Sequence, residues 1–308
     1  MPQYAYFQKK LVPIEEAKIS IMTHAFNYGT SCFEGIRGNW NSDDSTSYVF
    51  RPKEHFDRLR ESAKMIKIKL PNSSDELMGI MKDLVSRCAY REDIYIRPVA
   101  YKGQAAVANL RLHTLEDDFH MFIMPLGNYL DPTKGLRCMT STWRRSDDLA
   151  IPPRAKIGGM YINSVLSKTE AVLNGYDEAI MLNADGHVSE GSGENVFIIS
   201  KGKLVTPAVT DNVLVGITRD SIIQVAKNEL GMETVERSMD RSEMYLADEM
   251  FLTGTAAHLT PVVEVDHYEI GNGEVGPTVK KLQALYFDII RGKNKKYSKW
   301  SLPIQAGR

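Results

Sequence analysis

Lys156 lies in a loop that is stiff before it and flexible after it. Residues 151–163 read IPPRAKIGGMYIN, so two prolines precede the lysine and two glycines follow it. Proline restricts the backbone angle φ, whereas glycine lets another group approach the chain closely. A primary amine on so short a tether could act as a nucleophile or a proton acceptor where its surroundings favour the neutral amine. A solvated surface lysine is the alternative, and this loop alone does not exclude it.

Glu194 stands at the start of a segment that is typical of a buried strand. In SEGSGENVFII, residues 189–199, it follows a Gly-Ser-Gly turn and precedes a strongly apolar run. A carboxylate that enters a protein core costs free energy unless it is paired or hydrogen bonded. The pattern therefore predicts a cationic or N–H partner for Glu194, in either a structural or a catalytic role.

Two segments of the second half could bind an anion. At Gly216, Ile217 and Thr218 the chain enters a helix, whose first N–H groups lack helical partners and favour a phosphate. Capping by Thr218 explains the same residues without a ligand. In FLTGTAAHLTP, residues 251–261, a Thr-Gly-Thr turn follows a short apolar strand, and such strand ends can hold an oxyanion or form an ordinary turn.

Three other patterns have simpler explanations when each is taken alone. AFNYGTSCFEGIRG, residues 25–38, carries Tyr28, Phe33 and Arg37 among glycines, as expected for side chains packed around a sharply turning backbone. Arg58 lies off the apolar stripe of its helix, which predicts a solvated side chain. The GNGEVG segment at 271–276 fits a dinucleotide fingerprint, but the half-polar segment before it and the proline after it favour a glycine-rich turn.

The elements that must position these groups follow from apolar spacing. The helix at 72–89 opens with Ser73 and Glu76 in capping-box register, and the strand around Pro98 is expected to be an edge strand or to bend. The helix after the lysine should turn Ile162 and Val165 inward, with Leu166 and Thr169. Further helices are expected near 51–66, 161–174, 218–231 and 278–290, and strands near 91–103, 118–126, 136–145 and 178–207.

A turn-rich segment, GNYLDPTKG at 127–135, marks the expected boundary between two domains. A chain of 308 residues is long enough for about two domains of ordinary size. We therefore expect a small N-terminal domain at 1–124, an interdomain loop at 125–136 and a larger C-terminal domain at 137–308.

Composition excludes several classes of function. A formal net charge of -1 offers no electrostatic basis for binding nucleic acid or an anionic membrane, and no apolar stretch approaches the ~20 residues of a membrane helix. Residues 1–16 lack the pattern of a secretory signal. The seven histidines show no ligand spacing, so no metal site is expected. Three cysteines without a C-x-x-C pair predict buried free thiols in the cytoplasm, namely Cys32, Cys88 and Cys138.

Taken together, six segments closely resemble the branched-chain amino acid aminotransferases. They are NYGTSCFEGIRG, YIRP, AKIGGMYINS, SEGSGENVF, VGITRD and TGTAA, and the resemblance covers nearly the whole chain in order. It implies a pyridoxal-phosphate enzyme of fold type IV with α+β architecture, in which a small N-terminal α/β domain and a larger barrel-like C-terminal domain enclose the cofactor. It also implies a homo-oligomer, at least a dimer, whose neighbouring subunit completes each active site.

The resemblance assigns cofactor roles to residues that are ambiguous on their own. Lys156 would bond the cofactor aldehyde and then move a proton from the substrate Cα. Glu194 would face the pyridine nitrogen and keep it protonated, and Tyr161 would bond the ring 3′-oxygen. The phosphate would be held by the helix start and two further side chains, a set that comprises Gly216, Ile217, Thr218, Arg58 and Thr255.

The same resemblance predicts how substrates bind. The α-carboxylate would be held by Tyr95, Thr255 and Ala256, and Arg97 would bind the distal carboxylate of glutamate or 2-oxoglutarate as a bidentate guanidinium. The apolar side-chain pocket would be lined by Phe33, Tyr28 and Tyr129. The implied reaction is transamination between L-leucine, L-isoleucine or L-valine and 2-oxoglutarate, which yields the 2-oxo acid and L-glutamate.

Two departures from the family leave substrate breadth open. The loop at 103–113 is apolar and carries Arg111, and Leu126 stands where several bacterial relatives have tryptophan. Rivals of the same fold are D-amino acid aminotransferases, R-selective amine transaminases and aminodeoxychorismate lyases. A nicotinamide-dependent dehydrogenase would depend on the GNGEVG turn. An interaction protein without chemistry would need none of Lys156, Tyr161, Glu194 and Arg58.

Overall fold

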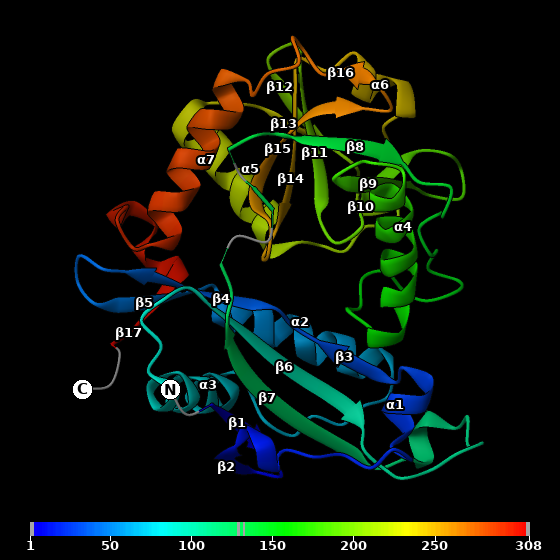
Figure 1. Cartoon of the computed structure of the whole chain (residues 1–308), viewed down its shortest axis with the longest axis vertical. Coiled ribbons are helices and arrows are strands. Elements are labelled where there is room, and N and C mark those ends of the chain that lie inside the picture. Colours follow the sequence, from blue (N-terminus) through cyan, green and yellow to red (C-terminus); the bar gives the residue numbers. More distant parts are fainter. Residues whose placement is uncertain (1–2, 128–129, 132, 306–308) are drawn as a thin grey trace. The chain divides into compact units, whose positions relative to one another are not determined.

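The computed structural model of the chain describes residues 3–127, 130–131 and 133–305 (Figure 1). Its contacts divide the chain into two compact units. Unit 1 comprises Met1–Gly127, Ala155–Gly159 and Asp288–Arg308, and unit 2 comprises Asn128–Arg154 and Met160–Phe287.

Unit 1 is built on one sheet with strand order β17-β5-β4-β6-β7-β1-β2, and β3 also pairs with β6. The strands are β1 (Tyr4–Phe7), β2 (Lys10–Pro13), β3 (Ser31–Phe33), β4 (Ile36–Asn41), β5 (Thr46–Phe50), β6 (Ile94–Lys102), β7 (Asp117–Pro125) and β17 (Ser301–Gln305). The helices are α1 (His24–Tyr28), α2 (Pro52–Met65) and α3 (Ser74–Cys88), with 3-10 turns at Ile14–Glu16, Leu112–Thr114 and Lys295–Trp300.

Helices α2 and α3 pack against each other and against strands of this sheet. Both helices turn apolar side chains inward, since Phe56 and Leu59 of α2 and Leu84 of α3 are buried in the core of unit 1. The predicted capping box of α3 is present, because Ser73 Oγ accepts from the Glu76 N–H and the Glu76 carboxylate accepts from the Ser73 N–H. Two of the four N-terminal N–H groups are thereby satisfied locally.

The C-terminal segment belongs to unit 1, which corrects the predicted assignment of all residues after 136 to one domain. Strand β17 pairs antiparallel with β5 from Ser301↔Phe50 to Gln305↔Thr46. Residues 155–159 also group with unit 1. Neither return of the chain is visible in local sequence patterns, because both depend on pairing between segments far apart in the sequence. The placement of the boundary within 125–136 stays a prediction.

Pro98 does not mark a sheet edge, because β6 is paired on both sides. On one side β6 pairs with β7, and on the other it pairs first with β4 and then with β3. Pro98 lies between these last two pairings, where its carbonyl accepts from the Glu34 N–H at 3.0 Å. Pro98, which has no N–H group to donate, thus lies opposite the gap between β3 and β4.

Unit 2 contains a closed barrel of six strands. The sheet order is β10-β9-β8-β15-β14-β11-β12-β13, and an additional β10–β11 pairing closes the ring. The strands are β8 (Leu136–Thr140), β9 (Glu178–Leu182), β10 (Val188–Gly191), β11 (Asn195–Ser200), β12 (Lys203–Thr206), β13 (Thr234–Glu236), β14 (Glu249–Gly254), β15 (His258–Val265) and β16 (Tyr268–Glu269). The helices of unit 2 are α4 (Tyr161–Leu173), α5 (Ile217–Leu230) and α6 (Arg241–Tyr245). Helix α7 (Pro277–Ile290) runs from unit 2 into unit 1 at Asp288, and the 3-10 turn at Gly158–Met160 runs from unit 1 into unit 2. The predicted barrel-like α+β architecture is confirmed.

Helix α4 buries a different face from the predicted one. Its buried residues are Ser164, Ser167 and Ala171, whereas Ile162 and Val165 are exposed. The helix packs on β9, and small side chains allow a close approach of the two backbones. Counting apolar residues selected the wrong face because the inward side chains are small rather than apolar.

Some general features can be stated for the described part of the chain. The three cysteines are free and buried, as predicted. Among the described residues, no helix combines the length and apolarity needed to cross a membrane, and no cluster of three metal-ligating side chains occurs. The GNGEVG segment forms a turn between β16 and α7, as predicted.

Candidate active site

The Lys156 backbone is hydrogen bonded to two elements of unit 1. Its carbonyl oxygen accepts from the Phe33 N–H at 3.1 Å, at the end of β3, and its N–H donates to Ser62 Oγ of α2 at 3.1 Å. The Lys156 Nζ lies 5.2 Å from the centroid of the Phe33 ring. These two bonds hold the Lys156 backbone against β3 and α2 of unit 1, although the chain directly before Ala155 and directly after Gly159 belongs to unit 2.

The two glycines after Lys156 are required by a close backbone crossing. Gly29 has a φ of 66°, and a Cβ there would lie 2.6 Å from the Gly159 Cα. The Gly159 N–H donates to the Gly29 carbonyl at 3.0 Å. A Cβ on Gly158 would lie 2.3 Å from Ser31 Oγ. Both glycines thus let the lysine loop lie directly on the segment that leads into β3.

Arg58 is not the solvated arginine that helical spacing predicts. Its side chain is 11% exposed, and its Nε and Nη2 donate to the two Glu34 oxygens at 2.7 and 2.8 Å. His55 Nδ1 lies 2.7 Å from Glu34 Oε2. Burial alone would raise the pKa of the Glu34 carboxyl, but Arg58 and His55 together hold it below its usual range. The three side chains form a buried cluster on α2 and the β3–β4 connection.

Arg97 contacts both Tyr95, on the same face of β6, and Phe33 of β3. Arg97 Nη2 donates to the Tyr95 hydroxyl at 2.9 Å, and the guanidinium carbon lies 4.2 Å from the Phe33 ring centroid and 5.0 Å from that of Tyr95. A Cβ on Gly35 would lie 2.2 Å from the Tyr95 hydroxyl oxygen. The glycine of the Phe-Glu-Gly segment is therefore what makes room for this tyrosine.

The remaining predicted pocket residues differ in exposure. Tyr28 is 41% exposed, and its hydroxyl accepts from the Ala108 N–H at 2.9 Å. The loop at 103–113 also holds Arg111, whose N–H and Nε lie 3.1 and 3.3 Å from Asn109 Oδ1. Tyr129 lies outside the described residues. Its predicted role in the apolar pocket stays a prediction.

Glu194 of unit 2 has the N–H partner that the sequence predicts. It lies between β10 and β11, is 4% exposed, and its Oε2 accepts from the Gly193 N–H at 3.0 Å. Burial, followed by the negative charge of Glu178, raises the pKa of Glu194 to about 8, against the opposing effect of the Gly193 N–H. Lys168 Nζ lies 2.6 Å from the Glu178 carboxylate. Glu194 is thus a buried carboxyl that would gain from a cationic partner.

The start of α5 is not capped by a side chain. Gly216 is its N-cap residue, with φ -72° and ψ 133°, and no side-chain hydrogen bond is made there. Capping by Thr218 is therefore not the explanation of this helix start. A Cβ on Gly216 would lie 2.0 Å from Asn195 Oδ1. The helix start consequently lies directly against the first residue of β11.

Glu194 and the turn after β14 also lie together. Asn195 pairs with Thr253 across β11 and β14, and a Cβ on Gly254 would lie 3.6 Å from Glu194 Cγ. Among the described residues, the buried Thr253 hydroxyl has no hydrogen-bond partner. Unit 2 therefore gathers three predicted groups around the start of β11: Glu194, the α5 start with Gly216, Ile217 and Thr218, and the turn with Thr255 and Ala256.

Tyr161 is the first residue of α4 and is partly buried. Two residues that sequence reasoning missed are Glu34 and His55. Glu34 lies within the quoted Phe-Glu-Gly segment, and it is fully buried. Like Glu194, Glu34 is a carboxylate in the protein core and needs a partner, so the same reasoning could have identified it.

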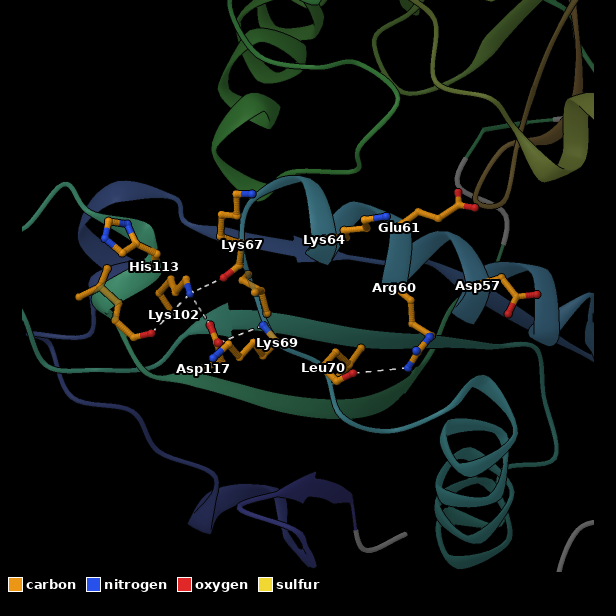
Figure 2. A pocket seen from close by; sticks show the side chains of 12 residues that line it. Asp57, Arg60, Glu61, Lys64, Lys67, Lys69, Leu70, Lys102, His113 and Asp117 are labelled. Carbon is orange, nitrogen blue, oxygen red and sulfur yellow. Dashed lines mark hydrogen bonds and ion pairs between the residues drawn. The ribbon is translucent and has the colours of Figure 1, made fainter.

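A cavity of about 850 Å³ in unit 1 lies along α2 (Figure 2). It is lined by charged side chains of α2 and of the segments at 67–70 and 113–117, and none of the predicted site residues lines it. Its buried amine, Lys102, is bonded to the Lys67 carbonyl at 2.7 Å and to Asp117 at 2.6 Å. That amine is held by the protein itself, so we do not assign the reaction to this cavity.

Comparison with known proteins identifies the family. A family model described as amino-transferase class IV matches residues 31–265. The chain belongs to the class IV aminotransferases. A relative from Aquifex aeolicus, named probable branched-chain-amino-acid aminotransferase, is 49% identical over 301 residues, which cover 98% of this chain and 96% of the relative.

Solved structures of class IV aminotransferases agree with this assignment. The branched-chain aminotransferase of Thermoproteus uzoniensis with norvaline has a TM-score of 0.94 at 40% identity, covering 99% of this chain and 100% of the other. The branched-chain amino acid aminotransferase of Thermobaculum terrenum in its PLP-form has a TM-score of 0.92 at 37% identity, covering 98% of both chains. The predicted family resemblance and fold type are confirmed.

Proposed function

We propose that the protein catalyses pyridoxal-phosphate-dependent transamination between L-leucine, L-isoleucine or L-valine and 2-oxoglutarate, which yields the branched-chain 2-oxo acid and L-glutamate. The observation that carries this proposal is the shared Phe33 ring, which contacts both the Lys156 amine and the Arg97 guanidinium. A reactive amine beside an aromatic wall and a cation suits substrates with an apolar side chain and substrates with an acidic one. The names of the similar enzymes support the same assignment.

The residues of the chain fit pyridoxal phosphate. Glu194 is a buried carboxyl whose raised pKa would fall again beside a protonated ring nitrogen. The α5 start has no side-chain cap and carries the N–H groups and the dipole that favour a phosphate. When bound, the cofactor would supply an electron sink for the negative charge that develops at the substrate Cα.

Lys156 would be the catalytic residue. Its Nζ would hold the aldehyde carbon of the cofactor and, once displaced by the substrate amine, accept the proton from the substrate Cα. The backbone bonds to Phe33 and Ser62 support this role, because they hold the amine on a short tether during both tasks. A merely solvated lysine would need neither bond.

Three groups would orient the cofactor. Glu194 would hold a proton on the ring nitrogen, and Tyr161 would donate to the ring oxygen. Arg58 would bind the phosphate through the guanidinium that Glu34 already orients. Backbone N–H groups and hydroxyls would complete the phosphate site at Gly216, Ile217, Thr218 and Thr255.

Substrate recognition would divide between the two ends of the substrate. The Tyr95 hydroxyl already accepts from Arg97, so its own proton remains available for the α-carboxylate, together with Thr255 and Ala256. Arg97 would bind a distal carboxylate when one is present. The apolar wall would consist of Phe33, Tyr28 and Tyr129.

We further propose a cytoplasmic homo-oligomer in which a neighbouring subunit completes each site. Exposed apolar side chains on α4, among them Ile162, Val165 and Leu173, support a contact with a second copy. D-amino acid and R-selective amine transamination are the rival activities, and aminodeoxychorismate cleavage is a third.

Product analysis under multiple turnover separates the proposed transamination from the two rival transaminase activities. The loaded enzyme is incubated with 2-oxoglutarate and, in parallel, with L-leucine, D-leucine or an R-configured primary amine, and the glutamate formed is quantified with its configuration. The proposal predicts L-glutamate from L-leucine and little from the other two donors. Formation of D-glutamate, or preference for the amine, would move the function to a rival.

A further inference from the structure

The Arg97 guanidinium lies against two aromatic rings and a tyrosine hydroxyl. Among the residues that the structure describes, none forms an ion pair with Arg97, and its buried Nε has no hydrogen-bond partner. On β7, His120 and Asp118 lie on the same face of the sheet as Arg97, because Arg97 pairs with Phe122. Burial lowers the pKa of His120 to about 4, and Asp118 is bonded to the Tyr101 hydroxyl at 2.8 Å. Arg97 is thus a partly buried cation that makes cation–π contacts with Phe33 and Tyr95.

Two of these rings are held in place by the backbone. Phe33 is 7% exposed, and its N–H donates to the Lys156 carbonyl, so the backbone that carries the ring is bonded to the lysine loop. Tyr95 lies against Gly35, where no side chain could be accommodated. The Arg97 guanidinium therefore contacts two preformed faces, at 4.2 Å and 5.0 Å.

The proposed reaction poses a problem of charge at this position. A glutamate side chain brings its own carboxylate to Arg97, whereas a leucine side chain removes water from the guanidinium and offers no counter-charge. Desolvating an unpaired cation is costly. Contact with an aromatic face offsets part of that cost, and more strongly where water is excluded.

We propose that Phe33 and Tyr95 form an aromatic seat, which holds the Arg97 guanidinium while an apolar side chain occupies the pocket. Phe33 is then a specificity-determining residue, because its ring favours apolar substrates through Arg97 rather than through direct contact alone. This inference rests on the proposed function. It adds the reason why one pocket accepts two side chains of opposite character.

A simpler role for Phe33 makes a different prediction. If Phe33 is only an apolar wall, its removal weakens the binding of leucine-like ligands whether or not Arg97 is present. If the seat acts on Arg97, the effect of removing the ring disappears once the guanidinium is removed. A double-mutant cycle separates the two roles.

The test measures binding to the cofactor-loaded enzyme without turnover. The probes are 4-methylvalerate and glutarate, which correspond to leucine and glutamate with hydrogen in place of the α-amino group. Their dissociation constants are determined for the wild type, Phe33→Leu, Arg97→Leu and the double variant. If the aromatic seat exists, Phe33→Leu should raise the ratio of the dissociation constant of 4-methylvalerate to that of glutarate by about 3- to 30-fold. In the Arg97→Leu background the same substitution should leave the ratio unchanged.

Two further variants guard against an effect of folding. Phe33→Met keeps the bulk of the side chain without an aromatic face and should reproduce the change in ratio. Phe119→Leu removes a ring from β7 that lies beside Tyr6, and should affect both acids equally. If Phe33→Leu changes the ratio of the two dissociation constants equally in the Arg97→Leu background, the aromatic seat is overturned and the proposed function is left intact. A wild-type enzyme that binds neither acid would overturn both.

Discussion

Phe33 binds Lys156 through both its backbone and its ring. The Phe33 N–H donates to the Lys156 carbonyl at 3.1 Å, and the Lys156 Nζ lies 5.2 Å from the ring centroid. The backbone that carries the amine is consequently positioned by β3 and, through Ser62, by α2. Changes in the glycine-rich segment before β3 should therefore affect the chemistry of Lys156.

Replacing Lys156 by alanine should abolish the covalent attachment of the cofactor. Borohydride reduces the lysine–cofactor bond to a stable one, and mass spectrometry then detects the added mass. We expect full labelling of the wild type and none of Lys156→Ala. Lys53→Ala is the control, because this lysine is 57% exposed and forms a surface ion pair with Asp57 of the same helix, α2. Labelling of the Lys156→Ala protein at the wild-type level would refute the assignment.

Replacing Gly29 by alanine should displace the lysine loop. Its φ of 66° costs a residue with a Cβ about 1–2 kcal/mol, and the new Cβ would meet Gly159 at 2.6 Å. Gly175→Ala is a matched control, since its φ is 81° and a Cβ there has no neighbour within 4 Å. Both variants should lose stability in thermal unfolding, but only Gly29→Ala should bind pyridoxal phosphate less tightly. Equal affinities would show that the crossing does not position Lys156.

Replacing Glu34 by glutamine should weaken the binding of the phosphate group specifically. Arg58 would lose the carboxylate that orients it, and breaking a buried ion pair typically costs about 3–5 kcal/mol of stability. We expect a larger loss of affinity for pyridoxal phosphate than for pyridoxal, measured by fluorescence titration.

Glu54→Gln is the control for this substitution, because the Glu54 side chain is 43% exposed and pairs with Arg51 near the surface. It should change stability by at most about 1 kcal/mol. An equal loss of affinity for pyridoxal and its phosphate in Glu34→Gln would contradict the role of Arg58.

Glu194 predicts a pH dependence of stability in the cofactor-free protein. Its pKa is raised from 4.5 to about 8, so the folded state retains a proton that the unfolded state releases. Stability should therefore fall as the pH rises from about 4.5 to about 8. Glu194→Gln has no such proton, so its unfolding temperature relative to the wild type should increase over this range and level off above it. A constant difference would contradict the raised pKa.

The loaded Glu194→Gln enzyme provides a second measurement. It should retain the cofactor, which Lys156 and the phosphate site hold, but remove the substrate Cα proton orders of magnitude more slowly in a single turnover. Near-normal rates would show that Glu194 does not protonate the ring nitrogen.

Replacing Arg97 by leucine should separate the two half-reactions. The guanidinium is the predicted partner of the distal carboxylate, and such charged hydrogen bonds are among the stronger ones. We expect kcat/KM for 2-oxoglutarate and glutamate to fall by far more than that for leucine, measured in stopped-flow half-reactions. Equal losses with both substrates would indicate a structural role for Arg97.

Local patterns predicted those parts of the fold that depend on local chemistry. The α3 capping box needs only Ser73 and Glu76, three residues apart, and it forms as predicted. The return of β17 to β5 was missed because its partner strand lies about 250 residues away. The buried face of α4 was missed because Ser164 and Ser167 face inward, and serine carries no apolar signal.

The candidate site shows the same division. Glu194 was identified from its position before a buried strand, and its Gly193 N–H partner was expected. Arg58 was read as solvated from helical spacing, because its partner Glu34 comes from a different element. A pairing between elements leaves no periodic signal in either one.

The half-reaction with L-leucine directly tests whether the protein transaminates branched-chain L-amino acids. The loaded protein is mixed with L-leucine in the absence of any 2-oxo acid, and its absorption spectrum is followed in a stopped-flow instrument. The proposed function predicts rapid bleaching of the yellow cofactor and one equivalent of 4-methyl-2-oxopentanoate per site. A yellow protein that ignores L-leucine, yet bleaches with D-alanine or an R-configured amine, would contradict it.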